Sequence, residues 1–160
     1  MRKIKIEELS KEAFEPFGSY YDLVNPDGYG LGQFYPDRVV FPVNGEVPVT
    51  VSALKSPKDE VMKVTSAEFH NKTGEGVLCL NDDVVIHVSP ASDKPVPELT
   101  RAFFVPKGTF VKLNVGVWHL AALPVNEEVA NILILLPQRT YNNDCTVVEY
   151  SEEDQMELIF

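Results

Sequence analysis

Three histidines, His70, His87 and His119, each fall on a predicted β-strand or at the end of one. Side chains alternate between the two faces of a strand, so Glu68 and His70 share one face of the strand predicted over residues 62–70. Two imidazoles and a carboxylate that converge on one point would hold a divalent transition metal with open coordination positions. We therefore predict a site formed by Glu68, His70 and His119, and we consider His87 as a fourth ligand.

This convergence depends on the fold, because no two of the histidines are close together in the sequence. A histidine on a strand is often only a hydrogen-bonded core or edge residue, and that alternative stays open from the sequence. Only a closed sheet would bring the three side chains to one point.

Three cations are candidates for binding an anionic substrate. Arg101 begins a predicted strand, and Arg139 follows the apolar strand predicted over residues 130–136. A guanidinium group matches the two oxygens of a carboxylate, so either arginine could hold a substrate acid. Lys55, at the end of the segment 48–54, is a further candidate. Each of the three could instead be a surface residue paired with one of the 24 acidic side chains.

Several other kinds of chemistry find no support in the sequence. The serines lack the context of a nucleophile elbow, and there is no phosphate-binding glycine loop or dinucleotide fingerprint. The net charge of −10 repels nucleic acid, although it is compatible with a small anionic ligand. Two cysteines do not suggest a disulfide framework.

No apolar run is long enough to cross a bilayer, and the charged first residues do not resemble a signal peptide, so we expect a cytoplasmic protein without a membrane partner.

The pattern of short strands and turn signals predicts one all-β domain over residues 1–160, either a barrel or a sandwich. Ser10 is placed to cap a short helical turn. The link 89–99 contains three prolines and is predicted to be a loop. Turn sequences at 42–45, 81–83, 106–108 and 126–128 separate the strands, and the last three suit hairpins. Strands are predicted over residues 1–7, 19–23, 34–40, 48–54, 62–70, 76–80, 84–88, 101–105, 110–113, 118–122, 130–136 and 146–150.

The stretch 105–121 contains two bends followed by a histidine. A turn with Pro106 and Gly108 joins two strands, and a second bend at 114–116 precedes His119. This arrangement resembles the second sequence motif of the cupins, small β-barrels whose site lies inside the barrel.

A wider set of segments resembles the ureidoglycolate lyase family, formerly called ureidoglycolate hydrolase. The order and spacing of these segments carry the resemblance, which is also visible at the N-terminus in residues 9–14 and Gly18. The segments are 93–95, 99–103, Gly108, 111–114, 117–119, Arg139 and 144–145.

The resemblance implies a cupin-type double-stranded β-helix, a jelly-roll-like barrel that is usually dimeric. It also implies cleavage of ureidoglycolate to glyoxylate and urea during allantoin breakdown. A divalent transition metal, of unknown identity, on Glu68, His70 and His119 would then bind the substrate hydroxyl and carboxylate. Without a metal, His119 would be the base, and Arg139 or Arg101 would hold the carboxylate. Two alternatives stay open: a cupin that binds a small organic acid without catalysis, and a cupin enzyme for another hydroxy acid or sugar acid.

Overall fold

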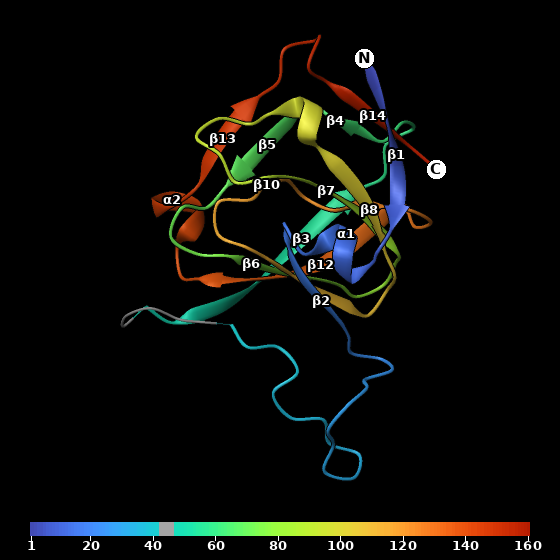
Figure 1. Ribbon diagram of the computed structural model, residues 1–160, viewed down its shortest axis with the longest axis vertical. Coiled ribbons are helices and arrows are strands. Elements are labelled where there is room, and N and C mark those ends of the chain that lie inside the picture. The colour runs from blue at the N-terminus through green and yellow to red at the C-terminus, as the bar shows by residue number, and fades with distance from the viewer. Residues whose placement is uncertain (42–46) are drawn as a thin grey trace.

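The computed structural model describes residues 1–41 and 47–160, and nearly all of its regular structure is β-strand (Figure 1). Two sheets face each other around an apolar interior. The nine-stranded sheet has the order β13-β5-β10-β7-β8-β1-β14-β4, with β11 paired to β7. The five-stranded sheet has the order β2-β9-β6-β12-β3.

The strand bounds follow the predicted segments closely in most places. The nine-stranded sheet contains β1 (Arg2–Glu8), β4 (Lys63–Val64), β5 (Ser66–Phe69), β7 (Val84–Ser89), β8 (Arg101–Val105), β10 (Trp118–His119), β11 (Leu123–Pro124), β13 (Thr146–Glu149) and β14 (Met156–Ile159). The five-stranded sheet contains β2 (Gly18–Asp22), β3 (Val49–Pro57), β6 (Glu75–Cys79), β9 (Thr109–Leu113) and β12 (Val129–Pro137).

Successive strands alternate between the two sheets, so the chain winds as a double-stranded β-helix. Strand β5 belongs to the nine-stranded sheet, β6 to the other, and β7 and β8 to the first again. The tight turns at 81–83, 106–108 and 126–128 therefore cross between sheets, and the prediction that they close hairpins is wrong. Asp82 shows how such a corner is stabilised: its carboxylate accepts the backbone N–H groups of Val125, Asn126 and Glu127.

The main core lies between the sheets and is built from alternate residues of each strand. Ile132 on β12 and Val77 on β6 point into it, as do Val88 on β7 and Phe103 on β8. Residues of β5, β7, β8 and β10 that point the other way form a second buried cluster, which β4 and β14 complete. The all-β prediction is confirmed, because each sheet buries one side-chain face in the main core.

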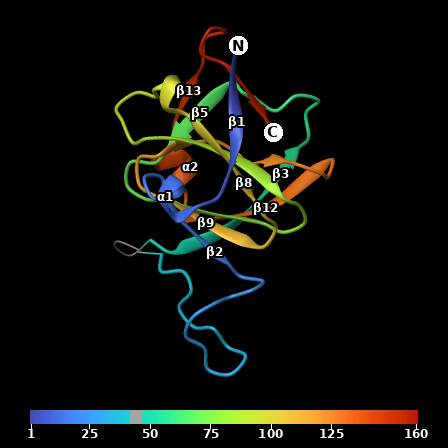
Figure 2. The same ribbon diagram turned by 45° about the vertical axis from the view of Figure 1, so that its right-hand side comes forward.

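One predicted strand is absent. Residues 34–40 lie in a long excursion from 23 to 41 that projects from the barrel (Figure 2). Pro36 has no N–H to offer a ladder, and Asp37 has a left-handed backbone with φ of 54°. Both features prevent a regular strand here. The turn predicted at 42–45 lies outside the described residues.

Other differences concern short elements. The predicted strand 62–70 is divided into β4 and β5. Of the predicted strand 118–122, only Trp118–His119 form a strand, β10, and β11 begins just beyond it. No predicted segment corresponds to β14, to the helix α2 (Thr140–Asn143) or to the 3-10 turn Pro97–Leu99. The helical turn capped by Ser10 is confirmed as α1 (Lys11–Phe14), where the Ser10 hydroxyl accepts the Ala13 N–H at 3.1 Å.

Among the described residues, no helix has the length and apolar character that a membrane span requires.

Candidate metal centre

Four side chains from three strand ends meet inside the barrel. Strand β5 supplies Glu68 and is followed directly by His70, and β6 begins with Glu75. Strand β10 ends with His119, whose backbone pairs with Glu68 across the β5–β10 ladder. Pairing in one ladder places these two side chains on the same face of the sheet.

The corner 71–74 brings Glu75 to the other three residues. It carries the chain from the nine-stranded sheet to the five-stranded sheet, so His70 and Glu75 approach the interior from opposite walls. Gly74 allows this crossing, because a Cβ atom at that position would collide with the backbone carbonyl oxygen of Leu113.

The geometry of the four groups is compact. One potential ligand atom from each of Glu68, His70, Glu75 and His119 lies within 4.8 Å of the others. The Oε2 atom of Glu75 is 3.0 Å from Nε2 of His70 and 3.3 Å from Nε2 of His119. Both imidazoles and Glu75 are buried, whereas Glu68 is half-buried.

The hydrogen bonds of the two imidazoles assign their tautomers. Nδ1 of His70 is 2.7 Å from the carbonyl oxygen of Asp144, and Nδ1 of His119 is 2.9 Å from that of Val117. A carbonyl oxygen only accepts, so each Nδ1 carries the proton. In the neutral rings both Nε2 lone pairs then face the carboxylate of Glu75.

Such a cluster of acceptors requires a positive charge at its centre, either protons or a cation. Burial would raise the pKa of Glu75, but the charge and hydrogen bond of His119, together with His70, lower it to about 2. Burial would lower the pKa of His119, but the Glu75 carboxylate outweighs it and raises that pKa. In the absence of a metal, a proton on His119 supplies this charge.

The same donor set fits a metal ion. Two imidazole nitrogens and two carboxylates match the ligands of zinc, manganese, iron and related divalent ions. Each histidine donates its other ring nitrogen to a backbone carbonyl, which is the usual outer-shell arrangement for histidine ligands. His70, Glu75, His119 and Glu68 would therefore hold the ion.

Two residues that follow α2 support the cluster. Besides binding His70 through its carbonyl oxygen, Asp144 accepts the backbone N–H groups of Asn71 and Lys72 through its carboxylate, at 2.9 and 2.8 Å. The thiol of Cys145 donates to Oε2 of Glu68 at 3.1 Å. Burial, together with Glu68, raises the pKa of Cys145 to about 12, so this thiol stays protonated and remains a donor.

The structure brings together Glu68, His70 and His119, the three residues that the sequence analysis grouped. It adds Glu75, which was not among the predicted site residues. A signal was available, because Glu75 follows His70 by five residues across a segment that contains Gly74. A short turn of this kind can return an acidic side chain to the histidine.

His87 lies outside the cluster. It is buried on β7 between Val85 and Ala102 of the second buried cluster, and its neighbours Ile86 and Val88 face the main core. The alternation along β7 therefore points His87 away from the interior that holds His119. Burial and the nearby charge of His119 lower the pKa of His87 to about 3, so its ring is neutral. The fourth group is Glu75 instead.

The predicted substrate-binding cations are dispersed. Arg101 binds the Glu7 carboxylate with two nitrogens and the carbonyl oxygen of Ala13 with a third. Lys55 is exposed on the outward face of β3, away from the interior. Arg139 is exposed and precedes α2 with a left-handed φ of 66°. Of the three, only Arg139 is close in sequence to Asp144, whose carbonyl oxygen binds His70.

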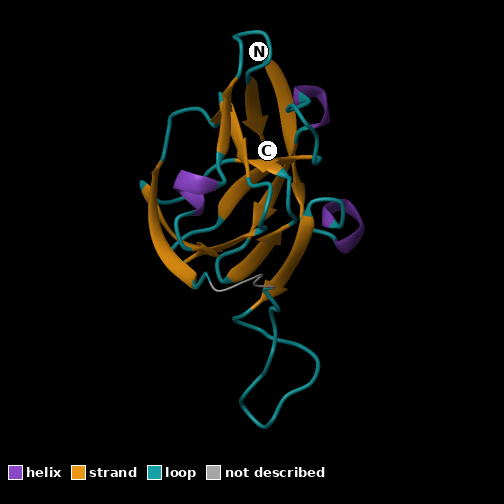
Figure 3. Ribbon diagram, turned by 90° about the vertical axis from the view of Figure 1, so that its left-hand side faces the viewer, coloured by secondary structure: helices purple, strands orange, loops and turns teal. Residues whose placement is uncertain are grey.

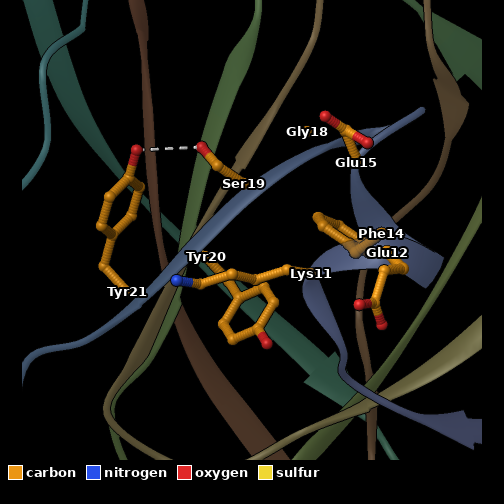
Figure 4. Close-up of a pocket in the computed structure, with 8 residues that line it drawn as sticks. All are labelled: Lys11, Glu12, Phe14, Glu15, Gly18, Ser19, Tyr20 and Tyr21. Atoms are coloured by element: carbon orange, nitrogen blue, oxygen red, sulfur yellow. Dashed lines mark hydrogen bonds between the residues drawn. The ribbon is translucent and has the colours of Figure 1, made fainter.

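Surface hollows adjoin the barrel at several points. One of about 380 Å³ lies against Lys72, Thr73 and Asp144, beside the corner between His70 and Glu75. Another of about 380 Å³ lies between α1 and β2, where Figure 4 shows Tyr20 and Lys11 among its lining residues. None of the four clustered residues lines the second hollow, which is therefore separate from the candidate centre.

The winding of the strands and the interior cluster together define a cupin-type β-barrel with a candidate metal centre. The sequence model of the family described as ureidoglycolate lyase matches residues 1–157. The chain belongs to the ureidoglycolate lyase family, as its sequence motifs indicated.

Curated relatives of this chain are named ureidoglycolate lyase, like the family. A Pseudomonas aeruginosa ureidoglycolate lyase is 27% identical over 165 residues, which cover 99% of this chain and 96% of that protein. A Pseudomonas putida ureidoglycolate lyase is also 27% identical, with 99% and 98% covered. Among solved structures, Bacillus subtilis oxalate decarboxylase, described with Mn(II) centres, gives a TM-score of 0.43 at 15% identity over 77% of this chain and 35% of that one. That structural likeness is too weak to support an argument.

Proposed function

We propose that this chain cleaves ureidoglycolate to glyoxylate and urea, as the name of its family implies. The observation that carries the proposal is the convergence of Glu68, His70, Glu75 and His119 within 4.8 Å inside the barrel. Family membership supplies the substrate, and the cluster supplies groups that can hold a metal and move a proton. The pathway in which this reaction belongs is allantoin and purine breakdown.

The reaction is an elimination. The substrate hydroxyl loses its proton. The bond between the carbon that carries this hydroxyl and the ureido nitrogen breaks, and a carbonyl forms at that carbon. The departing nitrogen takes up a proton and leaves as urea, so atoms and charge balance without a further reactant. Positioned proton transfers of this type each contribute roughly a hundredfold to ten-thousandfold in rate.

The four clustered residues have two different parts in this proposal: three fix the centre, and one transfers the proton. A divalent metal, when bound, would polarise the hydroxyl and carboxylate oxygens of the substrate. His70, Glu75 and His119 are buried and held by backbone carbonyls or by each other, so they serve to fix the centre. Glu68 is half-buried, with Oε2 bound by Cys145, which suits it to take the hydroxyl proton and return it to the nitrogen.

Arg139 is the best-placed of the predicted cations to hold the substrate carboxylate. It is exposed, and it begins the segment that delivers Asp144 to His70. Arg101 is engaged by Glu7, and Lys55 faces outward from the other sheet. The remaining parts of the proposal come from the family resemblance: a cytoplasmic homodimer of barrels, each formed by residues 1–160.

The test measures urea and glyoxylate release by protein loaded in turn with zinc, manganese, nickel and iron(II). His119→Ala and Glu75→Gln should each lower kcat/KM by roughly a thousandfold while the circular dichroism spectrum is retained. His87→Leu is the matched control, since it removes a buried imidazole outside the cluster, and it should retain activity.

Four results would contradict the proposal in different ways. Full activity of His119→Ala would remove the cluster from the mechanism. Binding of ureidoglycolate without turnover would favour a non-catalytic cupin. Release of ammonia and carbon dioxide in place of urea would indicate hydrolysis, and turnover of another hydroxy acid or sugar acid alone would reassign the substrate.

A further inference from the structure

Glu68 is the least restrained member of the candidate centre. Among the residues that the structure describes, its carboxylate has one hydrogen-bond donor, the thiol of Cys145, which lies 3.1 Å from Oε2. Each imidazole of the centre is instead held at both ring nitrogens, by a backbone carbonyl at Nδ1 and by Glu75 at Nε2. The orientation of Glu68 therefore depends on a single partner, Cys145.

The register of the β13–β5 ladder delivers the thiol to Glu68. Val147 pairs with Glu68, and Thr146 pairs with Phe69. Side chains alternate along an extended chain, so Cys145, which directly precedes β13, lies on the same face as Val147. A residue two positions from the direct partner is a diagonal neighbour in such a ladder, within reach of a long side chain. Backbone pairing therefore places the thiol beside the carboxylate.

Cys145 and the residue before it hold two members of the centre. The Asp144 carbonyl oxygen accepts the Nδ1 proton of His70, and the Cys145 thiol binds Glu68. In Figure 1, α2 and β13 lie beside β5 at one side of the barrel, the side that faces the viewer in Figure 3. One short segment after α2 therefore orients both a histidine and a carboxylate.

The chemistry of a thiol suits this part. A carboxylate has two oxygens with about four acceptor sites, and the single S–H group occupies one of them. Within residues 1–41 and 47–160 no donor is bound to Oε1 of Glu68, so this oxygen is available for the proton of a substrate hydroxyl. A thiol is a weak and uncharged donor, so it orients Glu68 without neutralising the negative charge that a base needs.

We propose that Cys145 is a positioning residue for proton transfer: its thiol holds Oε2 of Glu68 so that Oε1 is turned to the substrate hydroxyl. Cys145 acts only through Glu68 in this role. The inference rests on the proposed function, because that reaction gives Glu68 its proton to transfer. A displacement of about 1 Å at a reacting group can cost roughly a hundredfold in rate, so even a weak hydrogen bond that fixes the geometry matters.

Two other parts for Cys145 fit the structure less well. Its sulfur does not belong to the four groups whose ligand atoms lie within 4.8 Å of one another, so a metal would be held without it. A nucleophilic thiol lies next to a cation that stabilises the thiolate, whereas this thiol is near the carboxylates of Glu68, Glu75 and Asp144. Neither metal binding nor covalent catalysis is therefore its part.

The test compares three replacements of Cys145 in protein saturated with the metal that supports activity. Cys145→Ala removes the donor, Cys145→Val removes it while filling the space, and Cys145→Ser retains a donor. The alanine and valine variants should each lower kcat for urea release by roughly tenfold to a hundredfold with little change in KM, because Glu68 is then misoriented. Cys145→Ser should restore most of kcat, since its hydroxyl can donate to the same oxygen.

The other cysteine of the chain provides the matched control. Cys79→Ala removes a buried thiol from the main core, and it should retain kcat. This variant also allows a measurement that does not involve activity, because its infrared spectrum contains only the S–H stretching band of Cys145. That band should lie at the lower frequency of a hydrogen-bonded thiol, and Glu68→Ala in the same background should move it to the frequency of a free thiol.

Full kcat in Cys145→Val would overturn the inference, because the thiol would then be dispensable. Equal losses in Cys145→Ser and Cys145→Val would also overturn it, since the size of the side chain would matter and the hydrogen bond would not. An S–H band that Glu68→Ala leaves unchanged would remove the contact itself. A wild-type protein that releases no urea would refute the proposed function and this role with it. The infrared comparison distinguishes these failures, because it tests the contact without substrate.

Discussion

The barrel interior has two regions with opposite chemistry. Beneath α1, the rings of Phe14, Phe17 and Phe103 pack against one another, with the Phe14 and Phe103 centroids 5.1 Å apart at 90°. Across the core, where β5, β10 and β6 meet, ionisable groups are buried instead. The aromatic region gains stability from burial, whereas the polar region is stable only when its carboxylates and imidazoles balance one another's charge.

Arg101 illustrates the difference between the regions. Its guanidinium carbon lies 5.0 Å from the ring centroid of Phe103, and its nitrogens are bound by Glu7 and the Ala13 carbonyl. It therefore fastens β1 and α1 to β8 on the aromatic side. Arg101 therefore has a structural role in the aromatic region. A substrate carboxylate at the polar region would need a different cation that is not already paired.

The largest effect is expected from removing a ring from the aromatic region. Phe103→Ala should lower the free energy of unfolding by about 3–5 kcal/mol, because the fully buried ring leaves a cavity beside Phe14 and Phe17. Denaturant unfolding measures this loss. The neighbouring Phe104→Ala, whose side chain is partly exposed on the other face, should cost less.

At temperatures where the Phe103→Ala variant is folded, its metal affinity should equal that of the wild-type protein. A loss of affinity in the folded variant would mean that the two regions are coupled, and the comparison would fail.

A second prediction concerns the support of the polar region. Asp144→Ala removes the carboxylate that binds the Asn71 and Lys72 N–H groups, and so loosens the corner that positions His70 and Glu75. Metal affinity should fall by roughly 10–100-fold, as is usual for outer-shell partners. Titration calorimetry with the chosen metal measures this directly.

Asp144→Asn is the informative partner of that variant, since its amide oxygen can still accept one of the two N–H groups. It should recover part of the affinity lost in Asp144→Ala. Equal and unchanged affinity in both variants would show that the corner holds its shape without Asp144.

The smallest expected effect is at the Glu7–Arg101 ion pair. The hydrogen bond from Arg101 lowers the pKa of Glu7 below its ordinary value, against the opposing effect of burial. Because the folded pKa is depressed, the pair stabilises the fold above the unfolded pKa of about 4.3, and this contribution is lost as pH falls through the folded value. Both side chains are about a third exposed, so solvent screening limits the contribution to roughly 0.5–1 kcal/mol.

Comparison of Glu7→Gln with the wild-type protein at neutral and acidic pH tests whether the contribution of the ion pair to stability falls as pH falls. The difference in their free energies of unfolding should be present at pH 7 and should shrink below about pH 4. A difference that grows on acidification would contradict the assignment.

Much of the fold was predictable because its signals are local. Alternation of apolar residues placed most strands, the Ser10 hydroxyl marked the start of α1, and alternation also grouped Glu68 with His70. The strand predicted over 34–40 was wrong, because its β-branched and aromatic residues favour a strand but Pro36 and Asp37 interrupt the backbone ladder.

The sequence by itself determined an all-β chain, a family, and three of the four residues of the candidate centre. Only the tertiary structure decided that tight turns join opposite sheets, that Glu75 returns to His70, and that Arg101 is bound by Glu7, a residue 94 positions away. The physical reason is that alternation specifies which face a side chain occupies, whereas neighbours across the interior depend on how two sheets close around a shared core.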